Sequence, residues 1–495
     1  MKKFVLFAFC LLAVSAGCRK TPQGPTVPEP VATVDEFASD VLGSWYLWSE
    51  EIAGSLKRLD SRTCTDPIRV VNEIRYHRNG KEIDRWTELM ENLEEFSQSV
   101  QGLGPTYGYD LQYGQFTGTN TYFLLVTYVA KDSPAQRAGM KRGDILLTIN
   151  GADITKKNIN DAFSGKSIRF GFGRLVEQGK ERVIEADKER GAASLTAVDM
   201  YEDPILLTRV FDAGGKKVGY LVYNGFDLKS ARALTDSCAK LKAAGIAELV
   251  LDLRYNGGGY EYTESVLASL LAPPANVAAG DVFQTEVFNK KLNAQFKPED
   301  LQTRLSATHP FYKSNDDKVP AFTVDVSAAN PGIRKLYALV SGGTASASEG
   351  LLVGLGPYLD ITVIGSQTHG KYCAGYMLSP KDFYSEDYYR KNLSKFTAVQ
   401  DWGIYVMVSK FADKNGNNAA EPDGIMPGIR AMDNPFDGCQ LGDENETLLR
   451  AALKAAGKVY ATRAAEPWEA LEFNLQPLEH KPNILINNRK IPDYK

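Results

Sequence analysis

Apolar residues along the chain form short runs that stop at turns rich in small residues, and four of these runs predict buried strands. They lie at residues 217–226, 248–253, 336–340 and 361–364. Residues 228–245 separate the first two runs and have the pattern of a helix that a glycine ends. A strand, a helix and a strand at this spacing predict a parallel βαβ arrangement, so we expect an α/β domain over residues 196–460.

Near the N-terminus the apolar positions take a helical spacing instead. Thr33 and Glu36 have the spacing of a capping box, and Phe37, Val41 and Trp45 follow at positions that share one helix face. A second helical stretch covers residues 87–100. We therefore predict a small, mostly helical domain over residues 34–99.

Residues 100–195 resemble a PDZ domain. A strand at 122–129 precedes the segment 132–144 (DSPAQRAGMKRGD), and a strand at 145–149 then closes in an Asn-Gly turn. The resemblance implies a domain that adds an extended peptide to a sheet edge and holds its terminal carboxylate with backbone N–H groups. Residues 108–112 are a candidate for the loop that binds the terminal carboxylate of the peptide. The alternative is that these residues only begin a strand.

Length and composition limit the functional classes. A chain of 495 residues is long enough for about three domains, and 43% apolar with 24% charged residues is ordinary for globular proteins. A net charge of −4 without a basic cluster gives no indication of nucleic acid binding. Four histidines at unpaired positions and cysteines without a C-x-x-C motif argue against a transition-metal site. We expect neither a metal nor any other cofactor.

The first residues have the pattern of an export signal. Lys2 and Lys3 precede a short apolar stretch, and residues 15–18 (SAGC) resemble a bacterial lipoprotein cleavage site. This predicts a signal peptide over residues 1–17, lipidation of Cys18, and an extended proline-rich tether over residues 18–33. The expected location is the cell envelope, anchored by lipid on the periplasmic or surface side, and the alternative is an ordinary secretory signal cut nearby.

An exported chain folds where disulfides are permitted, and four cysteines remain after the signal and the lipid site. Cys373 lies two residues from a candidate catalytic lysine, and a bridge from it to Cys439 would hold that strand in place. The alternative is that Cys64, Cys238, Cys373 and Cys439 are four buried free thiols.

The candidate chemistry lies where two predicted strands end. Residues 341–349 (SGGTASASE) follow one strand and carry Ser346, with Ser341 and Ser348 as close rivals. Residues 368–371 (THGK) follow the next strand and carry Lys371. A serine at a strand-to-helix turn can expose its hydroxyl beside N–H groups that bind an oxyanion. A lysine can act as its base if burial lowers its pKa several units from about 10.4.

These motifs, together with residues 249–259 (LVLDLRYNGGG), resemble the tail-specific, or C-terminal processing, serine peptidases over roughly residues 34–460. The resemblance implies a PDZ domain joined to a ClpP/crotonase-like catalytic domain with a Ser-Lys dyad. It also implies Ser346 as the nucleophile and Lys371, 25 positions further on, as the base. The implied oxyanion site consists of the N–H of Ala347 and that of Gly258, and Gly257 is the second choice for the glycine donor.

Two segments and one position depart from the family pattern. Residues 271–334 interrupt the catalytic core, either as a cover over the substrate or, as we favour, as a plain surface excursion. Residues 461–495 form a C-terminal tail without a family counterpart. Many relatives carry a glutamine that orients the lysine where this chain has Gly375, so Gln367 or Tyr376 are expected to replace it. His369 is a possible alternative base.

The predicted function is therefore that of an exported serine endopeptidase that cleaves unfolded or tail-exposed proteins, with the PDZ domain controlling access. The expected partners are protein or peptide substrates, and a membrane through the lipid anchor only. The alternative is a catalytically weak lipoprotein that holds peptide tails through its PDZ domain. The sequence does not indicate an oligomeric state.

Overall fold

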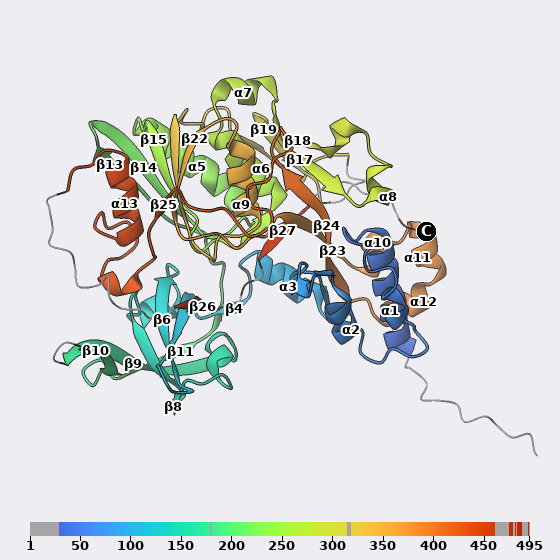
Figure 1. Ribbon diagram of the computed structural model, residues 1–495, viewed down its shortest axis with the longest axis horizontal. Helices are drawn as coiled ribbons and strands as arrows, with labels where there is room; N and C mark the ends of the chain where they lie inside the picture. Colours follow the sequence, from blue (N-terminus) through green and yellow to red (C-terminus); the bar gives the residue numbers. More distant parts are fainter. Residues whose placement is uncertain are drawn as a thin grey trace, which may run out of the picture.

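The computed structural model describes residues 29–178, 181–313, 318–460, 475–478, 481, 483–487 and 494 (Figure 1). The expected signal peptide, Cys18 and most of the expected tether lie outside these residues. The last part of the tether does not match the expectation, because helix α1 already begins at Glu29. Within the described part of the chain, no helix is both long and apolar enough to span a bilayer.

The first sheet carries the predicted βαβ unit. Its order is β13-β14-β15-β21-β22-β25, and every neighbouring pair from β14 onward is parallel. The strands are β13 (Ile205–Ala213), β14 (Lys216–Tyr223), β15 (Glu248–Asp252), β21 (Lys335–Val340), β22 (Asp360–Gly365) and β25 (Ile429–Arg430). Helix α5 (Ser230–Ala243) connects β14 to β15, as predicted.

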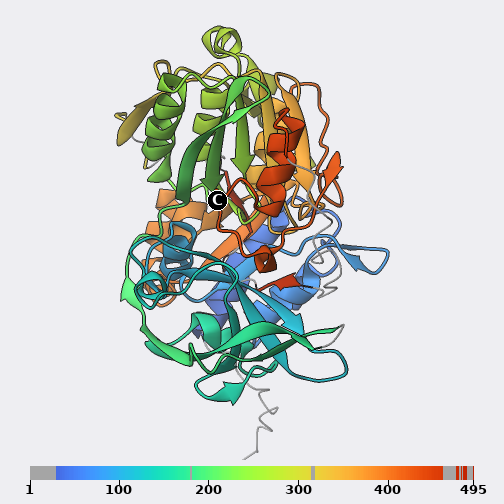
Figure 2. The same ribbon diagram turned by 90° about the vertical axis from the view of Figure 1, so that its left-hand side faces the viewer.

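Helices cover both faces of this sheet (Figures 1 and 2). Val218 and Tyr220 of β14 belong to the core cluster that includes α13 (Thr447–Ala455), whereas Leu221 belongs to the large cluster under α5, α6 (Glu261–Leu271) and α9 (Ala347–Leu355). Neighbouring residues of a strand point to opposite faces, so a strand covered on both sides must be apolar almost throughout. This is why the strands could be recognised as continuous apolar runs.

A second sheet gathers segments from the whole length of the chain. Its order is β16-β27-β23-β24-β17-β18, with β3 also paired to β24. The strands are β3 (Glu88–Met90), β16 (Gly258–Tyr260), β17 (Val282–Phe288), β18 (Gln302–Arg304), β23 (Cys373–Leu378), β24 (Gly403–Ala412) and β27 (Ile484–Ile486). The predicted helix over residues 87–100 is therefore partly wrong: the pairing with β24 makes residues 88–90 a strand, and α3 covers only Leu93–Val100.

The interruption at residues 271–334 is more than a surface excursion, because its strand β17 pairs with β24 inside the second sheet. Residues such as Phe283 and Phe288 of β17 belong to the main core. The segment also contains α7 (Pro274–Ala279), α8 (Lys290–Asn293), η3 (Pro298–Leu301), β19 (Thr308–Phe311) and β20 (Phe322–Asp325).

The N-terminal helices pack on the second sheet and share its core. Helix α1 runs from Glu29 to Ser44, so Thr33 lies inside it and donates its hydroxyl to the Glu29 carbonyl instead of capping its start. The other elements are η1 (Leu56–Arg58), α2 (Pro67–Ile74), β1 (His77–Arg78) and β2 (Lys81–Glu82), and α10 (Pro380–Phe383), α11 (Glu386–Lys391) and α12 (Leu393–Thr397) lie beside α1 (Figure 1).

The PDZ domain lies below the first sheet in Figure 1 and has its own core. Its central sheet has the order β10-β9-β7-β6-β5-β26. The elements are β4 (Pro105–Thr106), β5 (Tyr109–Gln115), β6 (Tyr122–Val129), α4 (Pro134–Arg137), β7 (Ile145–Ile149), β8 (Ala152–Asp153), η2 (Ile159–Phe163), β9 (Ser167–Gln178), β10 (Glu181–Ala186), β11 (Ala192–Thr196) and β12 (Val198–Asp199). Strand β26 (Gln476–Pro477) comes from the C-terminal segment.

Five buried charged side chains join the PDZ domain to the catalytic domain. Arg142 of the PDZ domain donates to Asp433 at 2.6 Å, and Arg254, next to the glycine turn, donates to Glu446 at 2.6 Å and to Asp252 at 2.7 Å. Both arginine side chains are 1% exposed. With three carboxylates and two guanidinium groups in mutual contact, each charge is compensated nearby, which burial requires.

The sequence left open whether Cys373 and Cys439 are bridged, and the structure has both as free thiols. Cys373 is fully buried in β23, which pairs with β24, whereas Cys439 is half-buried near the start of α13. Cys64 and Cys238 are also free and buried.

Replacing Arg142 by alanine should lower the free energy of unfolding by about 3–5 kcal/mol, because Asp433 loses one of its compensating charges in a buried site. Urea denaturation of the Arg142→Ala variant measures the loss. Arg174→Ala removes an arginine whose side chain is 46% exposed in its pair with Glu185, and it should change stability by less than about 1 kcal/mol. Equal effects of the two substitutions would contradict the importance of the buried cluster.

Candidate active site

Ser346 lies at the turn between β21 and α9, as the sequence predicts. Its backbone has a positive φ of 63°, which is unfavourable for a residue with a side chain. The side chain is fully buried, and within the described part of the chain its Oγ has no hydrogen-bond partner. Both features are costly, and strained or unsatisfied groups of this kind concentrate at functional sites.

The glycine turn after β15 comes directly against Ser346. A Cβ atom added to Gly258 would lie 2.8 Å from the Ser346 Cβ and 3.0 Å from the Ala347 nitrogen, so only glycine fits there. Asn256 joins the two turns, since its carbonyl accepts the Ala345 N–H at 3.0 Å. The structure thus brings together Ser346 and the three predicted oxyanion residues.

The three predicted N–H donors are not equivalent. The Gly258 N–H already donates to the Asn256 side chain at 2.9 Å. The Gly257 N–H has no hydrogen-bond partner among the described residues. Ala347 is the first residue of α9, where a backbone N–H has no partner within the helix. The N–H groups of Gly257 and Ala347 are therefore better placed than that of Gly258 to donate a hydrogen bond to a bound ligand.

Lys371 is fully buried between β22 and β23. Its Nζ donates to the Asn483 carbonyl at 2.7 Å and to the Tyr405 hydroxyl at 2.9 Å. Burial lowers the pKa of Lys371 to about 7, although Cys373, Asp84 and Glu349 favour the charged form. A large fraction of this amine is therefore neutral near neutral pH, which is the state that a general base needs.

One buried carboxylate connects the serine turn to the lysine loop. Oε2 of Glu349 accepts the N–H of Ser346 at 2.9 Å and that of Lys371 at 2.8 Å. Oε1 accepts the N–H of Gly370 at 2.8 Å and the Thr368 hydroxyl. Burial raises the pKa of Glu349, and the four hydrogen bonds oppose that rise. Together with the backbone hydrogen bond from the His369 N–H to the Thr344 carbonyl at 2.9 Å, this side chain holds the two turns together.

Tyr405 occupies the space that Gly375 leaves open. A Cβ atom at Gly375 would lie 2.7 Å from the Tyr405 ring, so a larger residue there would displace the tyrosine. The Tyr405 hydroxyl donates to the Leu485 carbonyl at 2.9 Å and accepts the hydrogen bond from Lys371. A tyrosine on β24 thus contacts the lysine at the point where relatives are expected to use a glutamine.

Gln367, Tyr376 and His369, which the sequence suggested as orienting groups or as an alternative base, take no part in the contact between Tyr405 and Lys371. Gln367 is exposed and donates to the Asp423 carbonyl, and Tyr376 donates its hydroxyl to Asn487. His369 packs against the Trp86 ring, and burial lowers its pKa to about 4, which makes it a weak base. Among the residues with described placement, no cluster of histidine, cysteine and acidic side chains could hold a metal ion.

Sequence reasoning did not assign a role to Glu349 or Tyr405. Glu349 ends the SGGTASASE motif, and its position three residues after a helix-starting serine is a signal that could have been used. Tyr405 has no such signal, because it lies 34 positions from Lys371 and reaches the lysine only through the pairing of β23 with β24.

Comparisons with known proteins agree with this arrangement. Residues 217–431 match the model of peptidase family S41, and residues 125–164 match a PDZ domain. The chain is 28% identical over 291 residues to a protein described as a CtpA-like serine protease in Staphylococcus aureus (strain N315), covering 58% of this chain and 49% of that protein. It is 22% identical over 281 residues to the carboxy-terminal processing protease CtpA of Bacillus subtilis (strain 168), covering 56% and 50%.

The chain therefore spans about half the length of the curated relatives that it matches. A solved structure from Bacteroides fragilis NCTC 9343, assigned to the S41 proteases, superposes with a TM-score of 0.61 at 21% identity. The match covers 88% of this chain and 98% of that one. At this identity the likeness establishes the fold, and it confirms the multi-domain α/β class with its PDZ and peptidase domains.

Glu349→Gln should lower the free energy of unfolding by about 3 kcal/mol. Each carboxylate oxygen accepts two hydrogen bonds, and the NH₂ group of glutamine would meet donors at either position. Urea denaturation measures the change, with the exposed Glu299→Gln as the matched control. A loss below about 0.5 kcal/mol would show that the carboxylate does not hold the two turns together.

Proposed function

Because the chain belongs to the tail-specific, PDZ-containing serine proteases with an S41 peptidase domain, we propose that it is a serine endopeptidase in which Ser346 and Lys371 form the catalytic dyad. The observation that carries the proposal is the placement of a fully buried lysine, whose backbone N–H Glu349 accepts, near a serine whose hydroxyl has no hydrogen-bond partner among the described residues.

The described residues can supply each step of peptide hydrolysis, although no hydrogen bond joins the Ser346 hydroxyl to Lys371 in the described structure. Neutral Lys371 has two N–H groups, which it donates to Asn483 and Tyr405, so its lone pair is free to take the Ser346 proton. The Ser346 Oγ then attacks the peptide carbonyl and forms a tetrahedral intermediate. The N–H groups of Ala347 and Gly257 stabilise its oxyanion. The protonated lysine gives its proton to the leaving amine, and water releases the acyl group from the serine.

The PDZ domain supplies substrate recognition in this proposal. The proposed substrates are unfolded or tail-exposed proteins, which can offer an extended strand to the edge of a sheet. Support comes from the PDZ match and from the buried contact of Arg142 with Asp433, which fixes this domain beside the glycine turn. The active site requires no metal or organic cofactor for these steps.

We also propose that the protein is exported and anchored to a membrane in the cell envelope through a lipid on Cys18. The support is the sequence of the first 18 residues, with two lysines, a short apolar stretch and small residues before the cysteine. Metabolic labelling with a fatty acid tests this directly: the wild-type chain should incorporate label and the Cys18→Ser chain should not.

The dyad is tested by digestion of an unfolded protein by the chain without its signal. The wild-type rate should rise as the pH increases through about 7, because burial lowers the pKa of Lys371 to about 7 and only the neutral amine can accept a proton. Ser346→Ala should be inactive, and Lys371→Ala should lose about 100- to 10,000-fold in rate. The exposed Lys381→Ala is the matched control and should keep full activity.

If wild-type protein is as inactive as both variants, the peptidase proposal fails. A protein that binds peptide tails without cleaving them would then be the better description.

Tyr405→Phe tests the orientation of the lysine. Loss of the hydroxyl should lower kcat about 10-fold with little change in KM, because Lys371 is positioned less well for proton transfer. The midpoint of the pH profile should move to lower pH, since an oxygen acceptor favours the protonated amine. Tyr358→Phe is the control, because it removes a tyrosine hydroxyl that donates to the Val282 carbonyl. An unchanged pH profile in Tyr405→Phe would argue against this role.

A further inference from the structure

The edge of the PDZ sheet is already occupied by the C-terminal segment of the same chain. Strand β26 pairs with β5 in antiparallel register, with Gln476 opposite Tyr113 and Pro477 opposite Gln112. The next residue, Leu478, donates its N–H to the Leu111 carbonyl at 3.1 Å. Figure 1 shows this short strand inside the PDZ domain, far from the PDZ residues in sequence.

Two leucines of the segment insert into the PDZ domain. Leu478 is 7% exposed and belongs to the same core cluster as Tyr109 and Leu111. Leu475 packs against the smaller cluster that includes Phe123. Gln476 and Pro477 between them are exposed. A main-chain strand addition with apolar side chains in pockets is the way in which extended peptides bind to an exposed sheet edge.

The same segment continues into the candidate active site. The carbonyl of Asn483 accepts the hydrogen bond from Lys371, and the N–H of Ile484 donates to the Gly257 carbonyl at 3.0 Å. Strand β27 then pairs in parallel with β16 of the glycine turn. Only five residue steps separate Leu478 from Asn483, a span of about 18 Å at most, so the two contacts are mechanically linked.

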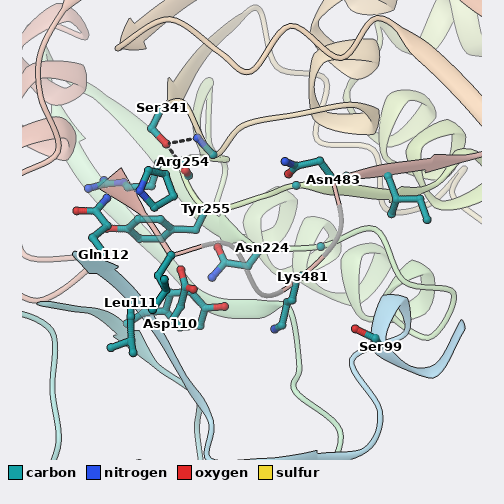
Figure 3. A pocket seen from close by; sticks show the side chains of 18 of the residues that line it. Ser99, Asp110, Leu111, Gln112, Asn224, Arg254, Tyr255, Ser341, Lys481 and Asn483 are labelled. Atoms are coloured by element: carbon teal, nitrogen blue, oxygen red, sulfur yellow. Dashed lines mark hydrogen bonds between the residues drawn. The ribbon is translucent and has the colours of Figure 1, made fainter. Parts of the chain in front are cut away.

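A pocket of about 120 Å³ lies along this path, between the PDZ edge and the catalytic turn. Figure 3 shows Asp110, Leu111 and Gln112 of β5 on the same side of the space as Tyr255, with Lys481 and Asn483 of the C-terminal segment toward the middle and the other side. The buried amide of Asn224 also lines the pocket, and neither its oxygen nor its nitrogen has a hydrogen-bond partner in the described structure. Polar groups are therefore available there to a bound polypeptide.

The two ends of the segment are held very differently. Ile484, Leu485 and Ile486 are at most 5% exposed and lie between two strands of the second sheet. The part on the PDZ domain, β26, is the outermost strand of its sheet among the residues that the structure describes. Its ion pair between Lys481 and Glu202 joins a lysine side chain that is 39% exposed to a carboxylate that is 12% exposed, so water still reaches the lysine. The PDZ end can therefore detach while β27 stays in place.

We propose that residues 475–478 are a built-in ligand of the PDZ edge strand, which an extended segment of a protein substrate displaces in order to bind. This regulation rests on the proposed peptidase function. In the resting state the edge strand β5 is covered, and Lys371 is held by the carbonyl of Asn483 on the same segment. Binding of a substrate at β5 releases residues 475–478, while β27 and the Asn483 carbonyl that contacts Lys371 stay in place.

The test uses the full chain without its signal and with Ser346→Ala, so that the probe is not cut. The probe is a fluorescein-labelled peptide with the sequence of residues 470–478, and its binding is followed by anisotropy. A tethered competitor acts at an effective concentration near the millimolar range, so Leu478→Asp should bind the probe at least about 10-fold more tightly than the parent. Gln476→Ala, at an exposed position, should bind like the parent. Equal affinity of Leu478→Asp and the parent, or binding to neither, would overturn the inference.

Hydrogen exchange on the parent protein gives a second measurement that needs no substitution in the segment. Saturating probe should speed up exchange at the Leu478 amide while β6 stays protected. Unchanged exchange at Leu478 under saturation would also overturn the inference. Proteolysis by the Ser346-containing chain is measured separately. Displacement of the segment without proteolysis would contradict only the proposed peptidase function, and proteolysis without displacement would contradict only this inference.

Discussion

Glu349 accepts hydrogen bonds from the serine turn and from the lysine loop at the same time, and the rest of the candidate site depends on that arrangement. The two turns come from different strands of the first sheet, and one backbone hydrogen bond, from the His369 N–H to the Thr344 carbonyl at 2.9 Å, joins them beside Glu349. A carboxylate is suited to this task because its two oxygens can accept several donors at once. Its burial is costly, and four hydrogen bonds compensate that cost.

The same principle operates at the boundary between the domains. Arg254 follows directly on the strand that leads to the glycine turn, and it contacts Asp252 and Glu446 in the catalytic domain while sharing Asp433 with Arg142 of the PDZ domain. A buried charge must stay compensated, so the PDZ domain cannot shift here without exposing or unpairing a charge. The position of the PDZ domain and the shape of the glycine turn are therefore coupled through a shared set of charges.

Local patterns in the sequence were sufficient for the parts of the site that depend on local structure. Ser346, Lys371 and the glycine turn each follow an apolar strand of the first sheet, and parallel strands bring their carboxyl ends to one edge. The Asn-Gly turn of the PDZ domain was also predicted correctly, since β7 and β8 form a hairpin there. In these cases a few neighbouring residues determine the backbone.

The parts that the sequence did not reveal depend on pairing over long distances. Residues 88–90 become a strand only because β24 lies beside them, and β17 enters the second sheet for the same reason. Tyr405 reaches Lys371 across a strand pair, and residues 475–478 reach the PDZ edge from the far end of the chain. Thr33 has the spacing of a helix cap but lies within α1, which already begins at Glu29.

Activation of Ser346 by the buried Lys371 is tested most directly by the rate at which a serine-directed phosphonate labels the protein as a function of pH. Mass spectrometry identifies the labelled residue. Labelling is expected at Ser346, should speed up as the pH rises through about 7, and should be lost in Lys371→Met. Absence of labelling between about pH 6 and pH 10, or labelling that is as fast in Lys371→Met as in the wild type, would contradict this activation.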